Sequence, residues 1–432
     1  MICDPCGVLR PQPALARDVR TPSPSPAVAA ATGAPDLATP ALPVGRLRLV
    51  VLLGALCAFG PLSLDMYLAA FPRIAADFSV GQAPVQLTLT ACLIGLALGQ
   101  VVSGPLSDRY GRRRPLLVGV AVYAGASLLC AFAPSVGVLT GLRLLQGLAG
   151  AAGVVISRAM VRDLHTGAEA ARFFSALMLV NGLAPILAPL LGAQVLELTG
   201  WRGVFVVLSA IGLVLLAAVA WGLPETLPAA RRRGGGVRET GRVFRGLSTD
   251  VAFLGPALSS GLVLGAMFAY ISGSSFVLQE VYGLSPRGFS LAFGTNAAGL
   301  ILLSQVSGRL VGRVSPLRLL TVGVLLSLTG ALALLAAVLA GGGLTGVLPA
   351  LFLVVSSVGL VSPNASALAL ADHPQVAGSA SALLGLSQYA LGGLLGPLVG
   401  LGGGHSGLPL ALVLTGSTLA ATAVLCGVVL RR

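Results

Sequence analysis

Long apolar runs separated by short polar stretches fill the chain from about residue 46 onward. An α-helix that crosses a bilayer needs about 20 predominantly apolar residues, and the runs come close to that length. Twelve runs can be marked out by apolar length alone, at about 49–71, 84–104, 116–133, 136–157, 172–196, 203–222, 251–279, 288–308, 317–340, 345–370, 377–401 and 408–430. The pattern predicts an all-α membrane protein with twelve spans, numbered here as helices 1 to 12.

A basic stretch divides the spans into two groups of six. It follows helix 6 and contains Arg231, Arg232 and Arg233 and then three glycines. We therefore predict two pseudo-symmetric six-helix halves joined by a cytoplasmic linker, with bounds 46–222, 223–250 and 251–432. Residues 1–45 are rich in proline and alanine without an apolar period, so we expect a disordered cytoplasmic tail and no signal peptide.

Composition and charge fit a membrane protein. Only 9% of the residues are charged and 56% are apolar, which leaves too little polar surface for a soluble domain. The net charge of +13 comes from 27 arginines and no lysine against 14 acids. With the tail in the cytoplasm, 20 arginines from Arg46 onward fall on that side and three, Arg73, Arg202 and Arg287, fall in the opposite loops. The positive-inside rule therefore places both termini in the cytoplasm.

Residues 104–117, GPLSDRYGRRRPLL, form a charged stretch between helices 2 and 3. A loop that only anchors the topology would not need the acid Asp108 or the glycines. The pattern G-x-L-x-D-R-x-G-R-R-x-x-L resembles the signature loop between helices 2 and 3 of the major facilitator superfamily. A shorter copy, 308–313, lies between helices 8 and 9. Aligned on Gly104, it carries Gly312 in place of Asp108, as a duplicated six-helix unit would predict.

Two ionisable residues stand out inside the spans, Asp65 in helix 1 and Arg143 in helix 4. Such residues usually face a bundle interior or a watery cavity. At the helical rise, Asp65 lies about 24 Å along helix 1 and Arg143 about 10 Å into helix 4 from the far side, so their depths match. We expect them to meet across a central cavity, where Asp65 could take up and release a proton. The alternative is that Asp65 only ends helix 1 near the interface.

Polar and aromatic residues near these charges are the candidates for substrate binding. Gln146 lies one turn from Arg143, and helix 7 carries aromatic and hydroxyl side chains at helical spacing, which suit an amphipathic cavity wall. Ordinary helix packing would explain many of the same residues. The candidates are Tyr67, Gln146, Asn181, Tyr270, Ser274 and Phe276.

Prolines interrupt helices 1 and 5. Pro61 lies four residues before Asp65 and is expected to kink helix 1. Helix 5 carries Pro185 and Pro189 between glycines, which predicts a bent and closely packed span. Antiporters of the superfamily have a similar Gly/Pro-rich motif in helix 5, although a pure packing role fits equally well.

Several segments resemble the Bcr/CflA group of bacterial drug–proton antiporters. They are 62–72, 85–117, 157–164 and 270–285. The resemblance implies proton-driven efflux of compounds such as chloramphenicol, bicyclomycin or sulfonamide by alternating access, in a bacterial inner membrane. It also implies that Asp65 and Arg143 serve proton coupling.

The resemblance assigns a conformational switch to the signature loop, comprising Gly104, Asp108, Arg109, Gly111, Arg112 and Asp163. It implies that Asp108 sits against the N-terminus of helix 11 in the outward-open state. It also implies that Arg112 pairs with Asp163 at the end of helix 4.

Other functions remain open or are disfavoured. A proton-coupled transporter of a sugar, nucleoside or amino acid would use the same fold. An enzyme is disfavoured because the three histidines, His165, His373 and His405, lie apart in loops, and the pair Cys3 and Cys6 lacks a second pair for zinc. A channel is disfavoured because the sequence shows no re-entrant segment that could form a selectivity filter. We expect a monomer that binds small-molecule substrate, protons and lipid, with no cofactor, metal or nucleic acid.

Overall fold

The computed structural model describes residues 46–164, 167–229, 232, 245–371, 377–400 and 406–429. The predicted tail, half of the predicted linker and the three histidines lie outside the described residues. In parts of some helices only the backbone is described, and the side chain of Asn181 is therefore not described.

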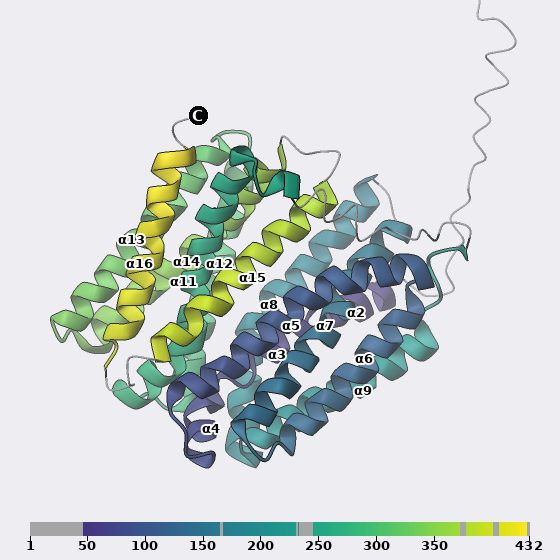
Figure 1. The fold of residues 1–432 in the computed structure, drawn as a ribbon, viewed down its shortest axis with the longest axis horizontal. Coiled ribbons are helices and arrows are strands. Elements are labelled where there is room, and N and C mark those ends of the chain that lie inside the picture. The colour runs from purple at the N-terminus through teal and green to yellow at the C-terminus, as the bar shows by residue number, and fades with distance from the viewer. Residues whose placement is uncertain are drawn as a thin grey trace, which may run out of the picture. The chain divides into compact units, whose positions relative to one another are not determined.

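The described residues are almost entirely helical, and the helices follow the predicted order (Figure 1). Helix 1 consists of α2 (Arg46–Cys57), α3 (Phe59–Asp65), η1 (Leu68–Ala70) and α4 (Phe71–Asp77). Helices 2 to 6 are α5 (Gln82–Tyr110), α6 (Arg113–Ala131), α7 (Val136–Leu164), α8 (Gly167–Thr199) and α9 (Trp201–Gly222). Helices 7 to 12 are α11 (Val251–Phe276) with η3 (Val277–Val281), α12 (Pro286–Leu310), α13 (Pro316–Leu339), α14 (Gly343–Ala371), α15 (Ala377–Gly400) and α16 (Leu408–Val424) with η5 (Leu425–Val429).

The lengths and compositions of these helices fit membrane spans. Among the described residues, ten helices are long and apolar enough to cross a membrane, and the bent helix 1 makes an eleventh. The remaining segment, Leu183–Thr199 of α8, is a shorter apolar stretch. The twelve-helix architecture expected from the apolar runs therefore matches the order of the helices.

Helix 1 is interrupted twice, and the interruptions position Asp65. The first, a bend of 41° after Cys57, has its cause in Pro61, whose ring cannot accommodate the carbonyl four residues earlier. The second lies at residues 66–70, between α3 and α4, where the chain tightens into the 3₁₀ turn η1. We call residues 66–70 the helix-1 break. Asp65 is the last residue of α3 and stands at its edge.

The helix-1 break packs directly against helix 5. A side chain on Gly192 of α8 would collide with the backbone of Met66, so only glycine allows this approach. The close packing predicted for helix 5 is present, although α8 stays helical through Pro185 and Pro189.

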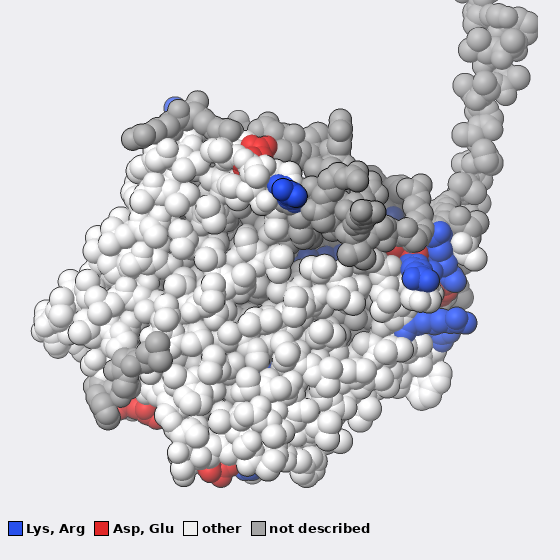
Figure 2. All heavy atoms as spheres, in the orientation of Figure 1, with Lys and Arg blue, Asp and Glu red and all other residues white. Residues whose placement is uncertain are grey.

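The two halves contact each other through helix pairs that combine one helix from each half. The main pairs are α5 with α15 and α8 with α12. We call the end of the bundle that carries Arg109, Arg113, Arg158 and Arg309 the arginine-rich end, and the other the opposite end. Figure 2 shows a cluster of blue side chains where α5 ends and α6 begins, beside a broad surface without charges.

The structure corrects the alignment of the internal repeat. Gly111 follows α5 with φ +86°, and Gly312 follows α12, beyond Val311, with φ +90°. Because both glycines make the same left-handed turn after equivalent helices, Gly312 matches Gly111 and not Asp108. Arg309 then takes the place of Asp108. The second copy therefore still lacks the acid.

Candidate functional site

A cavity of about 190 Å³ lies between the two halves. Helices 1 and 5 line it from the first half, and helices 7, 8, 10 and 11 from the second. The residues that line it are Gly60, Pro61, Leu64, Asp65, Pro185, Met267, Phe268, Tyr270, Ile271, Phe293, Ala297, Leu300, Val355 and Tyr389.

Aromatic rings form much of the wall from the second half. Tyr270 stacks on Phe293 with ring centroids 5.6 Å apart, and Phe268 meets Tyr389 at 5.8 Å. The Tyr270 hydroxyl accepts a hydrogen bond of 2.8 Å from the Asn296 amide. Such a wall offers flat apolar surfaces together with a fixed hydroxyl, which suits amphipathic ligands.

Asp65 is the one charged side chain among the residues that line the cavity. Its side chain is buried, with 5% of the residue surface exposed. None of the described residues makes a hydrogen bond or an ion pair with its carboxylate. Because the surrounding wall is mostly apolar, this carboxylate is the group on which a proton or a polar ligand atom can be held.

Arg143 is completely buried inside the first half. Its Nη2 donates a 2.7 Å hydrogen bond to the Ser63 carbonyl, and its Nη1 donates to Oε1 of Gln146. The guanidinium lies 4.1 Å from the ring centroid of Tyr67, a favourable cation–π arrangement. The Gln146 amide in turn donates to Ser127 at 2.7 Å. Arg143 therefore holds the end of α3 from within its own half.

The predicted contact between Asp65 and Arg143 is absent in this conformation. Depth was predicted well, because Arg143 reaches helix 1 at Ser63, two residues before Asp65. The predicted orientation of the two side chains toward each other was wrong. Arg143 bonds to the backbone on one side of α3, whereas Asp65 lines the cavity between the halves. The two groups are linked through α3 and not by an ion pair.

The other candidate binding residues fall in different places. Tyr270 lines the cavity. Tyr67 and Gln146 belong to the buried network around Arg143, and Ser274 is fully buried in α11. Phe276 borders a separate space at the opposite end and packs on Phe71 at 5.8 Å. The Asn181 side chain lies outside the described residues.

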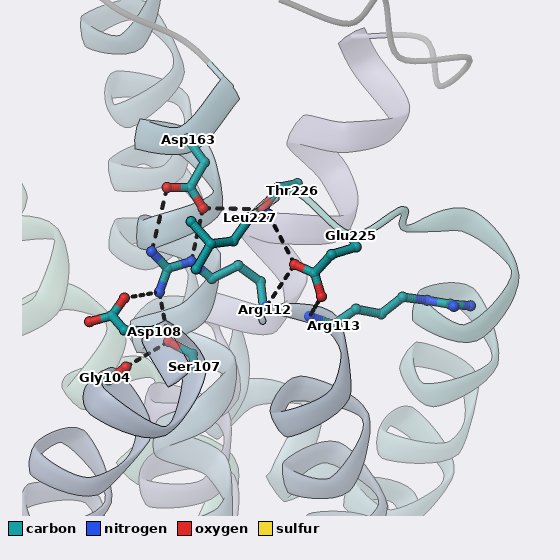
Figure 3. Close-up of polar contacts among 9 residues, drawn as sticks. All are labelled: Gly104, Ser107, Asp108, Arg112, Arg113, Asp163, Glu225, Thr226 and Leu227. Atoms are coloured by element: carbon teal, nitrogen blue, oxygen red, sulfur yellow. Dashed lines mark hydrogen bonds and ion pairs between the residues drawn. The ribbon is translucent and has the colours of Figure 1, made fainter. Parts of the chain in front are cut away.

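The signature stretch forms a compact ionic network at the arginine-rich end (Figure 3). Arg112 Nε donates to Asp163 at 2.8 Å, and Arg112 Nη1 donates to Asp108 and to Ser107. The predicted pair of Arg112 with Asp163 is therefore confirmed. Most of the stretch is not a loop, because α5 continues to Tyr110 and Gly111 makes the turn.

Asp108 faces Arg112 in this conformation and keeps 49% of its side-chain surface exposed. The side chains at the start of α15, the predicted partner of Asp108, lie outside the described residues. Burial disfavours the charge on Arg112, but Asp163 and Asp108 outweigh that cost, so the pKa of Arg112 lies above its usual value.

Glu225 completes the network, and the sequence interpretation missed it. Its carboxylate accepts from the backbone N–H groups of Arg112 at 2.8 Å, Arg113 at 3.2 Å and Leu227 at 3.0 Å. It therefore caps the N-terminus of α6, where a negative charge is favourable. Burial alone would raise the pKa of Glu225, but these three hydrogen bonds outweigh burial and lower it. The sequence signal that could have identified Glu225 is an acid just after helix 6, on the same side of the membrane as the basic loop.

In the described residues, twelve helices in two halves, with a cavity between the halves and an ionic network at one end, are typical of a membrane transporter. The sequence matches the Major Facilitator Superfamily over residues 51–397. The chain belongs to this superfamily. Within it, the sequence relatives support placement among the Bcr/CflA-type drug antiporters.

Three bacterial relatives are similar along most of their length. The Uncharacterized MFS-type transporter YdgK of Bacillus subtilis is 41% identical, with 82% of this chain and 89% of the relative covered. The Bicyclomycin resistance protein homolog of Haemophilus influenzae is 33% identical, with 81% and 88% covered. The Chloramphenicol resistance protein of Pseudomonas aeruginosa is 32% identical, with 80% and 81% covered.

The fold also resembles solved transporters. The crystal structure of a point mutant of the nucleoside transporter NupG superposes with a TM-score of 0.72, with 88% of this chain and 99% of that chain covered. At 11% sequence identity, this likeness concerns the fold alone.

Proposed function

We propose that the chain is a proton-coupled efflux transporter that exchanges small amphipathic antibiotics, such as chloramphenicol or bicyclomycin, for protons. The observation that carries the proposal is the single carboxylate, Asp65, in an otherwise uncharged cavity between the halves. The names of two relatives, a bicyclomycin resistance protein homolog and a chloramphenicol resistance protein, support the class of substrate.

Asp65 links cargo and proton because both need the same carboxylate. A charge at membrane depth costs roughly 2.5–3.5 kcal/mol on insertion scales. The cavity can therefore close around Asp65 only when the carboxylate carries a proton or bonds to a polar group of the cargo. Cargo from the cytoplasm displaces the proton inward, and a proton from outside displaces the cargo outward, which gives exchange.

Arg143 acts as a positioning residue in this scheme. Its bond to the Ser63 carbonyl fixes the end of α3 and so fixes where Asp65 enters the cavity. The arginine-rich end faces the cytoplasm by the positive-inside rule. The signature-loop network of Arg112, Asp163 and Glu225 then stabilises the cytoplasmic side of the first half.

The test is drug accumulation in an efflux-deficient bacterial host, measured for phenicols, bicyclomycin and sulfonamides with and without an uncoupler. We expect the protein to lower accumulation of at least one drug, the uncoupler to abolish the effect, and Asp65→Asn to abolish it at equal expression. Asp77→Asn is the matched control, because Asp77 is an exposed acid of the same helix that pairs with Arg202 at 2.6 Å.

Two results would contradict the proposal. Full efflux by Asp65→Asn would remove Asp65 from the mechanism. Unchanged accumulation across the whole panel would instead favour a transporter of a sugar, nucleoside or amino acid.

A further inference from the structure

Among the described residues, most of the polar contacts that join the halves gather at the opposite end of the bundle. A further one lies eight residues along α5 from Gln82, where Thr90 donates to the Gly393 carbonyl at 3.2 Å. Five hydrogen-bonded or ionic contacts between described residues connect the halves at the opposite end, and all come from helices 1, 2 and 5 on one side and helices 7 and 8 on the other. They are Gln82–Glu280, Ser275–Leu68, Gln279–Ala69, Arg287–Glu197 and Ser290–Pro189. This end of the bundle is therefore closed in the conformation described.

Two of these contacts differ from the rest because they bind the helix-1 break. Ser275 Oγ donates to the Leu68 carbonyl at 2.5 Å, and Gln279 Nε2 donates to the Ala69 carbonyl at 3.3 Å. Ser275, Leu68 and Ala69 are all buried. Backbone groups at membrane depth need a partner inside the protein, and here the second half contributes one for each carbonyl.

Every donor hydrogen of these two side chains is used in a hydrogen bond. Gln279 Nε2 has two hydrogens, and it donates to the Ala69 carbonyl and, at 2.8 Å, to Ser275 Oγ. Ser275 Oγ accepts that hydrogen bond and donates its own to the Leu68 carbonyl. No hydrogen of the amide or the hydroxyl is left over, so replacing either side chain by an apolar one breaks the chain of bonds.

Helix 1 is held from both halves around Asp65, by one attachment before this residue and by others within the helix-1 break after it. Arg143 of the first half bonds to the Ser63 carbonyl before Asp65, and Ser275 and Gln279 bond to carbonyls after it. Gln279 lies in a backbone irregularity, because η3, a π-helical turn at residues 277–281, follows directly after α11. Such turns are frequent at functional sites.

We propose that Ser275 and Gln279 are positioning residues that form a latch between helix 7 and the helix-1 break. The latch keeps the opposite end closed and must open before the cavity can face that side. The inference builds on the proposed alternating-access function, but its test needs neither cargo nor a proton gradient.

The test uses two reporter cysteines in a background whose native cysteines are replaced. Ala75→Cys reports the opposite end, because Ala75 is 8% exposed and borders the space between the halves beside Phe276. Ala297→Cys reports the central cavity, probed with a small thiol reagent from the arginine-rich side in vesicles. The latch variant is Ser275→Ala with Gln279→Leu, and the single variant Gln279→Met serves if the double variant does not fold.

We expect loss of the latch to raise alkylation of Ala75→Cys by an impermeant maleimide about tenfold, which corresponds to roughly 1.4 kcal/mol, and to lower alkylation of Ala297→Cys. The matched control is Ser290→Ala, which removes a similar bond, 2.9 Å to the Pro189 carbonyl, away from the helix-1 break. This control should change either rate by less than about threefold, since one hydrogen bond is worth about 0.5–1.5 kcal/mol and Ser290 also bonds within α12.

Reciprocal changes are the signature of a latch, because a merely loosened fold would raise both rates together. Unchanged rates in the latch variant, or a rise at both reporters, would overturn the proposal. Failure of drug efflux alone would contradict only the proposed function, because the reporters do not depend on it.

Discussion

Replacing Arg143 by lysine tests whether this buried cation is needed for its geometry as well as its charge. Lysine keeps the charge but, as a compact ammonium, cannot span the Ser63 carbonyl and Gln146 while lying flat on Tyr67. The variant loses one charge-assisted hydrogen bond, worth about 1.5–3 kcal/mol, and part of a buried cation–π contact, worth about 0.5–2 kcal/mol. We therefore expect a loss of roughly 2–4 kcal/mol in stability.

Native cysteines provide the assay for this prediction. Cys57, Cys92 and Cys130 are free and buried, whereas Cys426 is exposed. With Cys426 and the two tail cysteines replaced by serine, a dye that fluoresces on binding thiols reports unfolding of the first half. A loss of this size corresponds to a melting temperature lower by roughly 5–15 °C. The control Arg158→Lys changes an exposed arginine of the same helix and should shift the melting temperature by less than about 2 °C.

A normal melting temperature for Arg143→Lys, together with full transport, would refute the reasoning. It would mean that the guanidinium geometry does not hold α3, and that the charge alone suffices. A variant that melts normally but transports poorly would instead place Arg143 in the transport cycle without a role in stability.

Three further predictions follow from single contacts. Gly192→Val drives a side chain into the Met66 backbone, so it should lower the melting temperature in the thiol assay and reduce transport more than Gly125→Val, whose site has open space around it. Because the pKa of Glu225 is lowered in the folded protein, its stabilising effect is present above its unfolded pKa and is lost as pH falls through the folded value. The loss of melting temperature in Glu225→Gln should therefore be constant from pH 7 to about pH 5 and shrink as the pH falls further, through the lowered pKa of Glu225. A difference that grows on acidification would contradict the cap. Arg287→Gln breaks an ion pair whose arginine is 60% exposed, so the melting temperature should fall by less than about 3 °C, and a larger fall would mean that this pair is a main lock.

Helix positions could be read from the sequence because apolar length decides membrane spans. The twelve runs match the observed helices to within a few residues at most ends. The largest error lies at the end of helix 4, where α7 continues to Leu164 although the apolar run ends near residue 157. At the signature stretch, α5 likewise continues to Tyr110 although its apolar run ends near residue 104. Charged residues can stay helical once they leave the lipid, so apolar length underestimates the helix there.

Side-chain facing could not be read in the same way. The sequence predicts the depth of Asp65 and Arg143, but it treats helix 1 as one straight cylinder. The bend caused by Pro61 and the 3₁₀ turn of η1 rotate the helix locally, so neighbouring residues face different compartments. Tertiary contacts, such as that of Gly192 with Met66, fix the rotation, and no periodicity encodes them.

Glu225 shows a third limit. A capping carboxylate works through the backbone N–H groups of Arg112 and Arg113, and these leave no trace in side-chain patterns. By contrast, the Arg112–Asp163 pair could be predicted, because both partners are charged and lie at the same end of neighbouring helices.

The central claim is that one carboxylate, Asp65, binds either a proton or the cargo. The most direct measurement is proton release from purified protein in a weakly buffered solution when a transported drug is added. We predict drug-dependent release by the unaltered protein and by Asp77→Asn, and no release by Asp65→Asn. Equal release by Asp65→Asn would contradict the claim, because another group would then have to hold the exchanged proton.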